Sequence, residues 1–199
     1  MVQDLILASG SDIRQQLLRN AGLEFRVEPA RVDEEMMRDA MLAEGAPPRD
    51  IADALAEMKA RKVSEKNPGT MVIGCDQVLS FEKQLLSKPT SPDDARAQLT
   101  QMRSKRHELL SAAVICEDGR PVWRHVGVVR LTMRRFSDAY LDGYIERNWD
   151  SIRHSVGAYK LEEEGVRLFT QIDGDYFTVL GLPFLDLLSY LGLRGVIDQ

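Results

Sequence analysis

Cysteine and histidine are scarce in this chain, which has 2 cysteines and 3 histidines among 199 residues. Cys75 and Cys116 lie in the apolar stretches VIGCDQV and AAVICEDG, which are typical of buried strands. We therefore expect two reduced core thiols and no disulfide framework. The histidines are scattered, and nothing resembles a zinc motif.

Long hydrophobic runs and a basic, apolar leader are also missing. No apolar stretch approaches the ~18 residues of a membrane span. The N-terminus has neither the positive region nor the long apolar region of a signal peptide. These absences predict a soluble cytoplasmic protein without a membrane partner.

Positive charge is in the minority, with 26 Lys and Arg against 31 Asp and Glu and a net charge of −5. This balance argues against a sequence-independent nucleic-acid binder, which needs a basic surface for phosphates. A small nucleotide could still bind in a local basic pocket. With 44% hydrophobic residues, the chain can form one sizeable core, or one domain with a second lobe.

The patterning alternates strands with helices along the first half of the chain and favours hairpins in the second half. It predicts strands at 5–8, 25–27, 71–75, 108–114, 122–125, 126–133, 166–172 and 176–180. It predicts helices at 11–21, 34–43, 48–63, from 92 onward, 137–145 and after 183. The fold class is therefore α/β with a mixed sheet, not a doubly wound parallel one.

The stretch Ser9-Gly10-Ser11 joins the first strand to the first helix. Small residues at a helix start let backbone N–H groups and hydroxyls face an anion, with support from the helix dipole. Arg14, one turn into the helix, could bind the same anion through two hydrogen bonds. The alternative is a serine that caps the helix and a solvated arginine.

Asp76 follows a strongly apolar strand, so it is expected at the strand's carboxyl end, where ligands bind in open α/β sheets. A carboxylate there can hold a divalent cation or take a proton from water. The alternative is a helix cap or a buried, hydrogen-bonded acid.

Other charged residues are weaker candidates when each is taken alone. Glu34 opens a helix in an acidic cluster, which the dipole favours in any case. Lys59 lies on a charged helix face, and Lys88 precedes a proline in a loop. The basic loop Ser104–His107 is also explained by cations at a helix C-terminus.

Taken in order, the motifs resemble those of the Maf family of nucleotide pyrophosphatases. They run LILASGSDIR, VDE, LAEMKA, IGCDQV, KP, a basic loop ending in histidine, GAY followed by EG, and GDYFTVLGLP. The resemblance covers about residues 5–191. It implies one Maf-like domain over 1–199 with two lobes, in a mixed twisted sheet flanked by helices around a long central cleft, as in inosine triphosphatases.

The resemblance also implies the activity, which is hydrolysis of nucleoside triphosphates between the α and β phosphates with a divalent metal, Mg²⁺ or Mn²⁺. Members are regarded as house-cleaning enzymes and are linked to septum formation. A nucleoside triphosphate would then be the small-molecule partner. The sequence leaves the oligomeric state open, with a homodimer as one candidate.

Position by position, the resemblance implies a role for seven residues. Phosphate binding would fall to Ser9, Ser11, Arg14, Lys59 and Lys88, metal support to Glu34, and catalysis with metal binding to Asp76. Cations and metal neutralise charge on the phosphoryl group, while a carboxylate positions the attacking water.

The chain departs from the family pattern in two places. The family usually has S-P-R-R after the first serine, whereas here Asp12 and Ile13 replace the proline and one arginine. The basic loop lacks the usual glycine, which could transfer phosphate binding to Lys105 and Arg106.

Three positions resemble the branch of the family that prefers 7-methyl-GTP, namely Gln77, Lys160 and Glu162, whereas the GAY segment is typical of the branch that prefers dTTP and UTP. A carboxylate at 162 could accept both adjacent donors of guanine, while uracil and thymine suit an amide better. The acidic run Glu162–Glu164 would also favour a cationic methylated ring. The alternative is a solvated acidic turn.

Two other functions compete with this interpretation. One is an inosine or xanthosine triphosphate pyrophosphatase, which would share the phosphate chemistry and differ in the base pocket. The other is a nucleotide-binding regulator that has lost catalysis, which the missing arginine at position 13 suggests and the intact Asp76 opposes.

Overall fold

The structure is a computed structural model that describes residues 4–198. The chain divides into two compact units. The first unit takes its residues from Met1–Gln77, Ser111–Gly127 and Gly181–Gln199, and the second consists of Val78–Leu110 and Val128–Leu180. Each unit is described by itself, and the single domain with a long cleft stays a prediction.

A mixed sheet of seven strands confirms the predicted α/β class. The strand order is β2-β1-β3-β5-β6-β7, with β4 paired to β3. β1 is parallel to β2 and β3, whereas β4 and β7 run antiparallel to β3 and β6. The strands are β1 (Leu5–Leu7), β2 (Arg26–Val27), β3 (Met71–Phe81), β4 (Gln84–Leu86), β5 (Arg106–Glu117), β6 (Arg120–Met133) and β7 (Phe169–Asp173).

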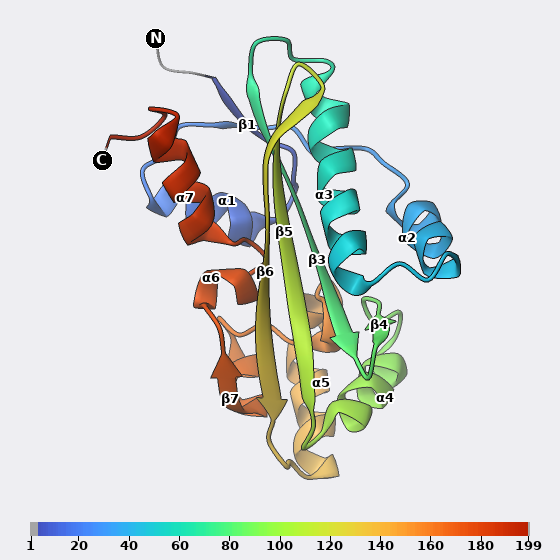
Figure 1. Cartoon of the computed structure of the whole chain (residues 1–199). Helices are drawn as coiled ribbons and strands as arrows, with labels where there is room; N and C mark the ends of the chain where they lie inside the picture. The colour runs from blue at the N-terminus through green and yellow to red at the C-terminus, as the bar shows by residue number, and fades with distance from the viewer. Residues whose placement is uncertain (1–3, 199) are drawn as a thin grey trace. The chain divides into compact units, whose positions relative to one another are not determined.

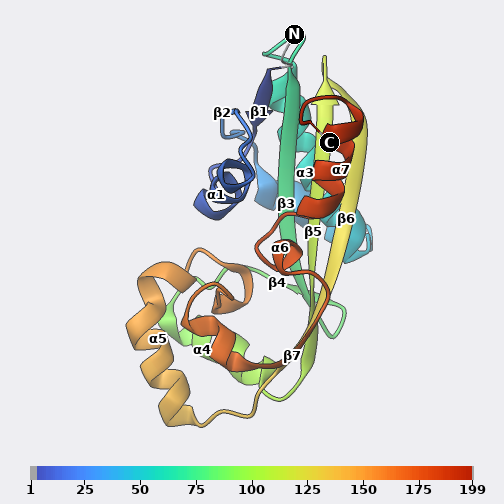
Figure 2. The ribbon, with the colours of Figure 1, turned by 90° about the vertical axis from the view of Figure 1, so that its left-hand side faces the viewer.

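Helices cover both faces of the strands of the first unit. α3 (Pro48–Ser64) lies over one face, while α1 (Asp12–Asn20) and α7 (Phe184–Leu193) lie over the other (Figures 1 and 2). Because both faces are covered, β1 and the start of β3 are uninterrupted apolar runs with buried side chains. α2 (Glu34–Ala43) precedes α3 and has no buried residue.

Side-chain caps explain where several helices begin. Asp33 accepts a hydrogen bond from Met36 N at the start of α2. Ser91 and Ser137 do the same for α4 (Pro92–Met102) and α5 (Asp138–Ile152). A side-chain oxygen at this position satisfies one of the N–H groups that the helix itself leaves unpaired. The predicted starts of these helices are therefore confirmed.

The second unit has an aromatic core. His107 and Tyr159 share a hydrogen bond of 2.7 Å between Nε2 and the phenol oxygen, and the Tyr159 ring meets Phe169 edge-on at 4.8 Å. Tyr144 on α5 donates its hydroxyl proton to the carbonyl of Ala158 at 3.2 Å. Ala158 belongs to a short 3-10 helix, η1 (Val156–Ala158). His107, Tyr159 and Tyr144 are all buried, so the predicted basic loop Ser104–His107 ends inside β5 and within the core.

The predicted strand pair at 166–172 and 176–180 is wrong in its second half. Residues Tyr176–Val179 form the short helix α6, whose first turn is capped because Asp175 accepts a hydrogen bond from Thr178 N at 2.8 Å. A 3-10 helix, η2 (Glu164–Leu168), occupies the start of the first segment. β7 follows η2 and pairs with β6 instead.

Three other predictions were too short or too divided. The strand predicted at 71–75 continues to Phe81, so Asp76 lies in the middle of β3 and not at its carboxyl end as expected. The strands predicted at 122–125 and 126–133 are one continuous strand, β6. The helix predicted at 137–145 extends to Ile152.

Both cysteines are buried and unpaired, as predicted. Within residues 4–198, none of the helices is long and apolar enough to cross a bilayer.

His107 should make stability depend on pH. Burial lowers the pKa of His107 from 6.5 to about 4, so the unfolded chain takes up a proton before the folded chain does. The free energy of unfolding should therefore fall by about 3 kcal/mol, on top of other titrations, as pH drops from 6.5 to about 4. Urea unfolding of wild type and His107→Gln across this range measures the difference in slope.

The exposed His154, changed to Gln, is the matched control. It should keep the wild-type slope. Identical slopes for wild type and His107→Gln would contradict the buried, neutral state of His107.

Candidate active site

The turn Ser9-Gly10-Ser11 after β1 is organised around the hydroxyl of Ser9. Ser9 Oγ accepts hydrogen bonds from Ser11 N and from Arg14 Nη1, each at 3.3 Å. Ser9 is buried, whereas Ser11 is half-buried. Ser11 occupies the N-cap position of α1, but its side chain makes no capping hydrogen bond. Ser11 is thus the N-cap residue, as the alternative for this segment has it, but its hydroxyl does not bond to the helix.

Arg14 is not a solvated arginine. Its Nε donates to the carbonyl of Gly181 at 2.8 Å, and its Nη1 donates to the carbonyl of Cys75 at 3.3 Å. Gly181 has a φ of +97°, and a Cβ there would lie 3.0 Å from Arg14 Nη2. Because glycine has no Cβ, position 181 can adopt a left-handed backbone conformation and leave room for the guanidinium of Arg14. Through these hydrogen bonds, Arg14 links α1 to the backbone of Cys75 in the middle of β3 and to the segment before α7.

Asp76, Lys59 and Glu34 form a charged triad at the interface of β3, α3 and α2. Lys59 Nζ lies 2.7 Å from Asp76 Oδ1 and 2.9 Å from Glu34 Oε2. Lys59 and Asp76 are buried, with 8% and 7% of their surface exposed. The ammonium of Lys59 therefore bridges two carboxylates, which satisfies charges that would otherwise be costly to bury.

The carboxyl of Asp76 has a shifted pKa. Burial raises the pKa of Asp76 above its ordinary value, while the charges of Lys59 and Arg14 oppose the shift and that of Glu34 adds to it. A carboxylate with a raised pKa is a better proton acceptor than one in water. This fits the predicted role of Asp76 in positioning or deprotonating a water molecule.

Gly74 explains how a helix lysine can reach a strand aspartate. Side chains two apart on a strand share a face, so Gly74 and Asp76 both face α3. A Cβ at Gly74 would lie 2.2 Å from the carbonyl oxygen of Ala56 and 2.5 Å from Ala60 N. α3 therefore packs directly on the backbone of β3. This close approach brings Lys59 to Asp76.

The donor set of the triad suits a magnesium-type ion. Mg²⁺ is usually held by one or two carboxylates together with substrate phosphates and water. Asp76 and Glu34 already converge on a single cationic atom, Lys59 Nζ. Among residues 4–198, no three His, Cys, Asp or Glu residues gather as a metal site of their own. The residues thus fit a cation that the substrate helps to bind.

The neighbours of Asp76 on β3 have different roles. Burial raises the pKa of the Cys75 thiol, so this thiol stays protonated and is a poor nucleophile. Gln77 donates from Nε2 to Ser111 Oγ on β5 at 2.9 Å. Gln77 is therefore held in place within the first unit.

The remaining predicted site residues belong to the second unit. Lys88 is exposed in the loop between β4 and α4. Lys160 Nζ pairs with Glu163 Oε1 at 3.3 Å, and Glu162 is exposed. The structure therefore brings together Ser9, Arg14, Glu34, Lys59 and Asp76 in the first unit and leaves the roles of Lys88, Lys160 and Glu162 as predictions.

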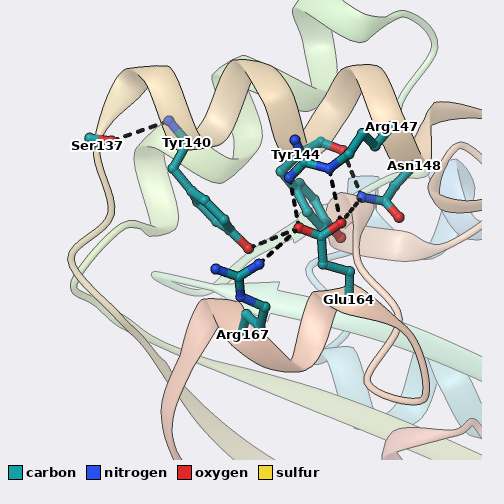
Figure 3. Close-up of polar contacts among 7 residues, drawn as sticks. All are labelled: Ser137, Tyr140, Tyr144, Arg147, Asn148, Glu164 and Arg167. Carbon is teal, nitrogen blue, oxygen red and sulfur yellow. Dashed lines mark hydrogen bonds and ion pairs between the residues drawn. The ribbon is translucent and has the colours of Figure 1, made fainter.

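The acidic run Glu162–Glu164 is divided in the structure. Glu163 accepts a hydrogen bond from Ser151 Oγ at 2.8 Å. Glu164 accepts from Arg147 Nη2 and Asn148 Nδ2, each at 2.8 Å (Figure 3). Two of the three glutamates thus hold this segment on α5, and the preference of the run for a cationic ring stays a prediction.

Lys105 and Arg106 are also engaged by acids of the second unit. Lys105 Nζ lies 3.0 Å from Glu82, and the guanidinium of Arg106 lies 3.6 Å from Asp173. Both pairs are exposed and therefore weak. The transfer of phosphate binding to these residues stays a prediction.

Sequence reasoning missed Gly74 and Gly181, although both lie in motifs that it had singled out. The role of Gly74, the glycine of IGCDQV, could have been predicted, since a glycine inside a strand often marks a place where another backbone approaches closely. The contact between Arg14 and Gly181 joins residues 167 positions apart, and no local pattern signals it.

Comparison with known proteins places the chain in a family. Residues 4–193 match the model of the Maf-like protein family, so the chain belongs to that family. It is 69% identical over 198 residues to a protein of Ruegeria pomeroyi named nucleoside triphosphate pyrophosphatase, with 100% of both chains covered. It is 46% identical, again over 198 residues and 100% of both chains, to a Brucella abortus protein named 7-methyl-GTP pyrophosphatase.

Among solved structures, a dITP/XTP pyrophosphatase from Mycobacterium abscessus is similar with a TM-score of 0.48 and 15% identity, covering 98% of each chain.

Replacement of Gly74 tests the geometry of the triad. Gly74→Ala should lower the free energy of unfolding by ~2 kcal/mol or more, because the new methyl group would overlap backbone atoms of α3 that cannot move without displacing the helix. Gly10→Ala is the control, since a Cβ at Gly10 meets only Pro29 at 3.6 Å. Chemical denaturation measures both variants. Equal stability of the two would contradict the direct packing of α3 on β3.

Proposed function

We propose that this Maf-family chain is a nucleoside triphosphate pyrophosphatase that cleaves between the α and β phosphates, releasing a nucleoside monophosphate and pyrophosphate. One observation carries the proposal: the buried Lys59 bridges the carboxylates of Asp76, in the middle of β3, and Glu34. Arg14 holds the serine turn and donates to the backbone of β3 next to Asp76. The 69% identity to a nucleoside triphosphate pyrophosphatase supports it.

The triad supplies the chemistry of the proposed reaction. Asp76 orients the attacking water and accepts its proton, which suits a carboxylate whose pKa is raised by burial. Lys59 offsets negative charge that develops on the phosphoryl oxygens. A divalent cation held by Asp76 and Glu34 would neutralise further charge on the phosphates.

The serine turn orients the phosphate chain. The hydroxyl of Ser11 makes no cap and is free for a phosphate oxygen. The N–H groups at the start of α1 and the helix dipole favour an anion at the same place. Arg14 fixes the shape of the turn through Ser9 and contributes its charge. We assign Lys88 a contact with the outer phosphates.

We propose 7-methyl-GTP as the preferred substrate, with Gln77, Lys160 and Glu162 as the residues that select the base. Glu162 is exposed, and no hydrogen bond or ion pair holds its carboxylate within residues 4–198, so this carboxylate can accept the two donors of guanine. The 46% identity to a 7-methyl-GTP pyrophosphatase supports this choice. Relatives at 69% identity carry the general name, so dTTP, UTP, inosine and xanthosine triphosphates belong in the same assay.

A regulator without catalysis is the alternative that Asp12 and Ile13 suggest. Ile13 is half-buried on α1, where it packs as an apolar residue. The triad argues for an enzyme, because a protein that only binds nucleotides has no need of a buried base. Release of pyrophosphate from the substrate panel decides between the two.

Asp76→Asn should reduce kcat by about 100-fold or more, the scale of a lost general base. The variant should still fold, since Lys59 keeps its ion pair with Glu34. Asp39→Asn, which changes an exposed acid of α2, is the control and should behave as wild type. Pyrophosphate release with Mg²⁺ or Mn²⁺ measures both. Turnover within a few-fold of wild type in Asp76→Asn would remove this residue from the mechanism.

Glu162→Gln tests the choice of base. The change replaces one acceptor by a donor that would face a guanine donor, at a cost of ~1–3 kcal/mol. We expect kcat/KM to fall on 7-methyl-GTP and to rise, relatively, on UTP and dTTP. Glu146→Gln, an exposed acid on α5, is the control. An unchanged ratio between these substrates would show that Glu162 does not select the base, while the pyrophosphatase activity itself would stand.

A further inference from the structure

The second unit contains a pocket of about 300 Å³ that the proposed reaction does not use. It is lined by Arg134, Phe136, Ser137, Tyr140 and Arg167. Arg134, Phe136 and Ser137 lie between β6 and α5. Tyr140 lies in the first turn of α5, and Arg167 lies in η2. No predicted catalytic, phosphate-binding or base-selecting residue is among them. A volume of this order is at the lower end of small-molecule sites.

Both charged residues of the lining are arginines, and both are exposed. The guanidinium of Arg134 is anchored, because its Nη2 donates to the carbonyl of Phe169 at 2.9 Å. That of Arg167 lies over the ring of Tyr140, 5.0 Å from its centroid. Each arginine is thus held in a defined direction, Arg134 by a neutral carbonyl and Arg167 by a ring and by a longer ion pair with Glu164.

Two acids lie at this pocket, and the charge of each is shared. Asp138, after Ser137, pairs with Arg103 at 2.6 Å, and Glu164 is held by several partners. Figure 3 shows Arg147 and Asn148 converging on its carboxylate from α5. These contacts lower the pKa of Glu164 to about 2. Arg167 is farther from the carboxylate, at 3.6 Å. Arg147 and Arg167 share the single charge of Glu164, so these two arginines together with Arg134 carry more positive charge than that carboxylate offsets.

The pocket also contains the start of α5. Ser137 caps the helix, with its Oγ accepting a hydrogen bond from Tyr140 N at 3.1 Å (Figure 3). α5 has 15 residues, so its dipole adds partial positive charge at this end. Two guanidinium groups and a helix N-terminus together suit an anion with several oxygens and more than one negative charge.

One wall of the pocket is apolar. The ring of Phe136 is buried, and Arg103 lies 4.9 Å from its centroid. Tyr140 packs beside it, with 6.3 Å between the ring centroids. This wall can take a small apolar or aromatic group attached to the anion.

From these contacts we propose that the pocket binds a small phosphate monoester, with the phosphate between Arg134 and Arg167 and the ester group on Phe136 and Tyr140. None of these lining residues is assigned to the proposed triphosphate site. A dianion is favoured over a monocarboxylate because two guanidinium groups face the same space.

The test is an NMR titration of the full-length protein, which locates binding by residue. Inorganic phosphate, phenyl phosphate and benzoate are the three probes. Phenyl phosphate should shift the amides of residues 136–141 and 166–168 with a Kd of about 1 mM or tighter. It should bind more tightly than inorganic phosphate, because of the apolar wall, and more tightly than benzoate, because of its second charge.

Variants separate this pocket from other anion-binding sites. Arg167→Ala and Arg134→Ala should each weaken the binding of phenyl phosphate by about tenfold. Arg135→Ala removes the same charge from a neighbouring exposed residue outside the lining and should change Kd by less than twofold. Arg14→Ala, in the proposed triphosphate site, should leave the shifts at 136–141 intact. Thermal unfolding verifies that each variant is folded.

Several results would overturn the proposal. Absence of shifts at 136–141 would remove the site, and equal weakening by Arg135→Ala would reduce it to general charge attraction. Tighter binding of benzoate would refute the choice of a phosphate, and equal affinity for phosphate and phenyl phosphate would refute the role of Phe136 and Tyr140. None of these results bears on pyrophosphatase activity.

Discussion

The ion triad of Lys59, Asp76 and Glu34 is the interaction on which the rest of the site depends. Lys59 and Asp76 are buried, and an unpaired charge in such a place would be costly. The pairing requires that α3 touch the backbone of β3, which Gly74 permits. The ion pair of Lys59 and Asp76 therefore lies within apolar packing, and the close packing of α3 on β3 at Gly74 makes this pair possible.

The polar groups of the two units have different roles. The first unit holds the triad, the serine turn and the Arg14 bridge to Gly181, so its polar groups serve the proposed phosphate chemistry. The second unit is built around an aromatic core that contains His107 and Tyr159. Its polar groups fix loops to α5, as Glu164 does, and leave two arginines facing a pocket of their own.

Local patterns in the sequence were enough to predict several helices and strands. The helix at 34–43 was predicted with its exact bounds, because Asp33 caps it and a Gly-Ala-Pro break follows. Asp76 was expected at the carboxyl end of its strand, but it lies in the middle of β3, because the apolar residues Val78, Leu79 and Phe81 continue the strand. The segment 176–179 was misjudged because its apolar residues fit a strand as well as a helix, and the cap at Asp175 decided the outcome. The partners of Arg14 and of Glu164 come from distant segments, so they became visible only in the folded chain.

The position of a divalent cation in a substrate complex tests the account most directly. Crystals grown with Mn²⁺ and a triphosphate that cannot be cleaved between the α and β phosphates would locate the metal by its anomalous scattering. We expect the Mn²⁺ within direct coordination distance of carboxylate oxygens of Asp76 and Glu34, and also bound to phosphate oxygens. A metal coordinated by other residues, with Asp76 and Glu34 still paired only to Lys59, would contradict the central role of the triad.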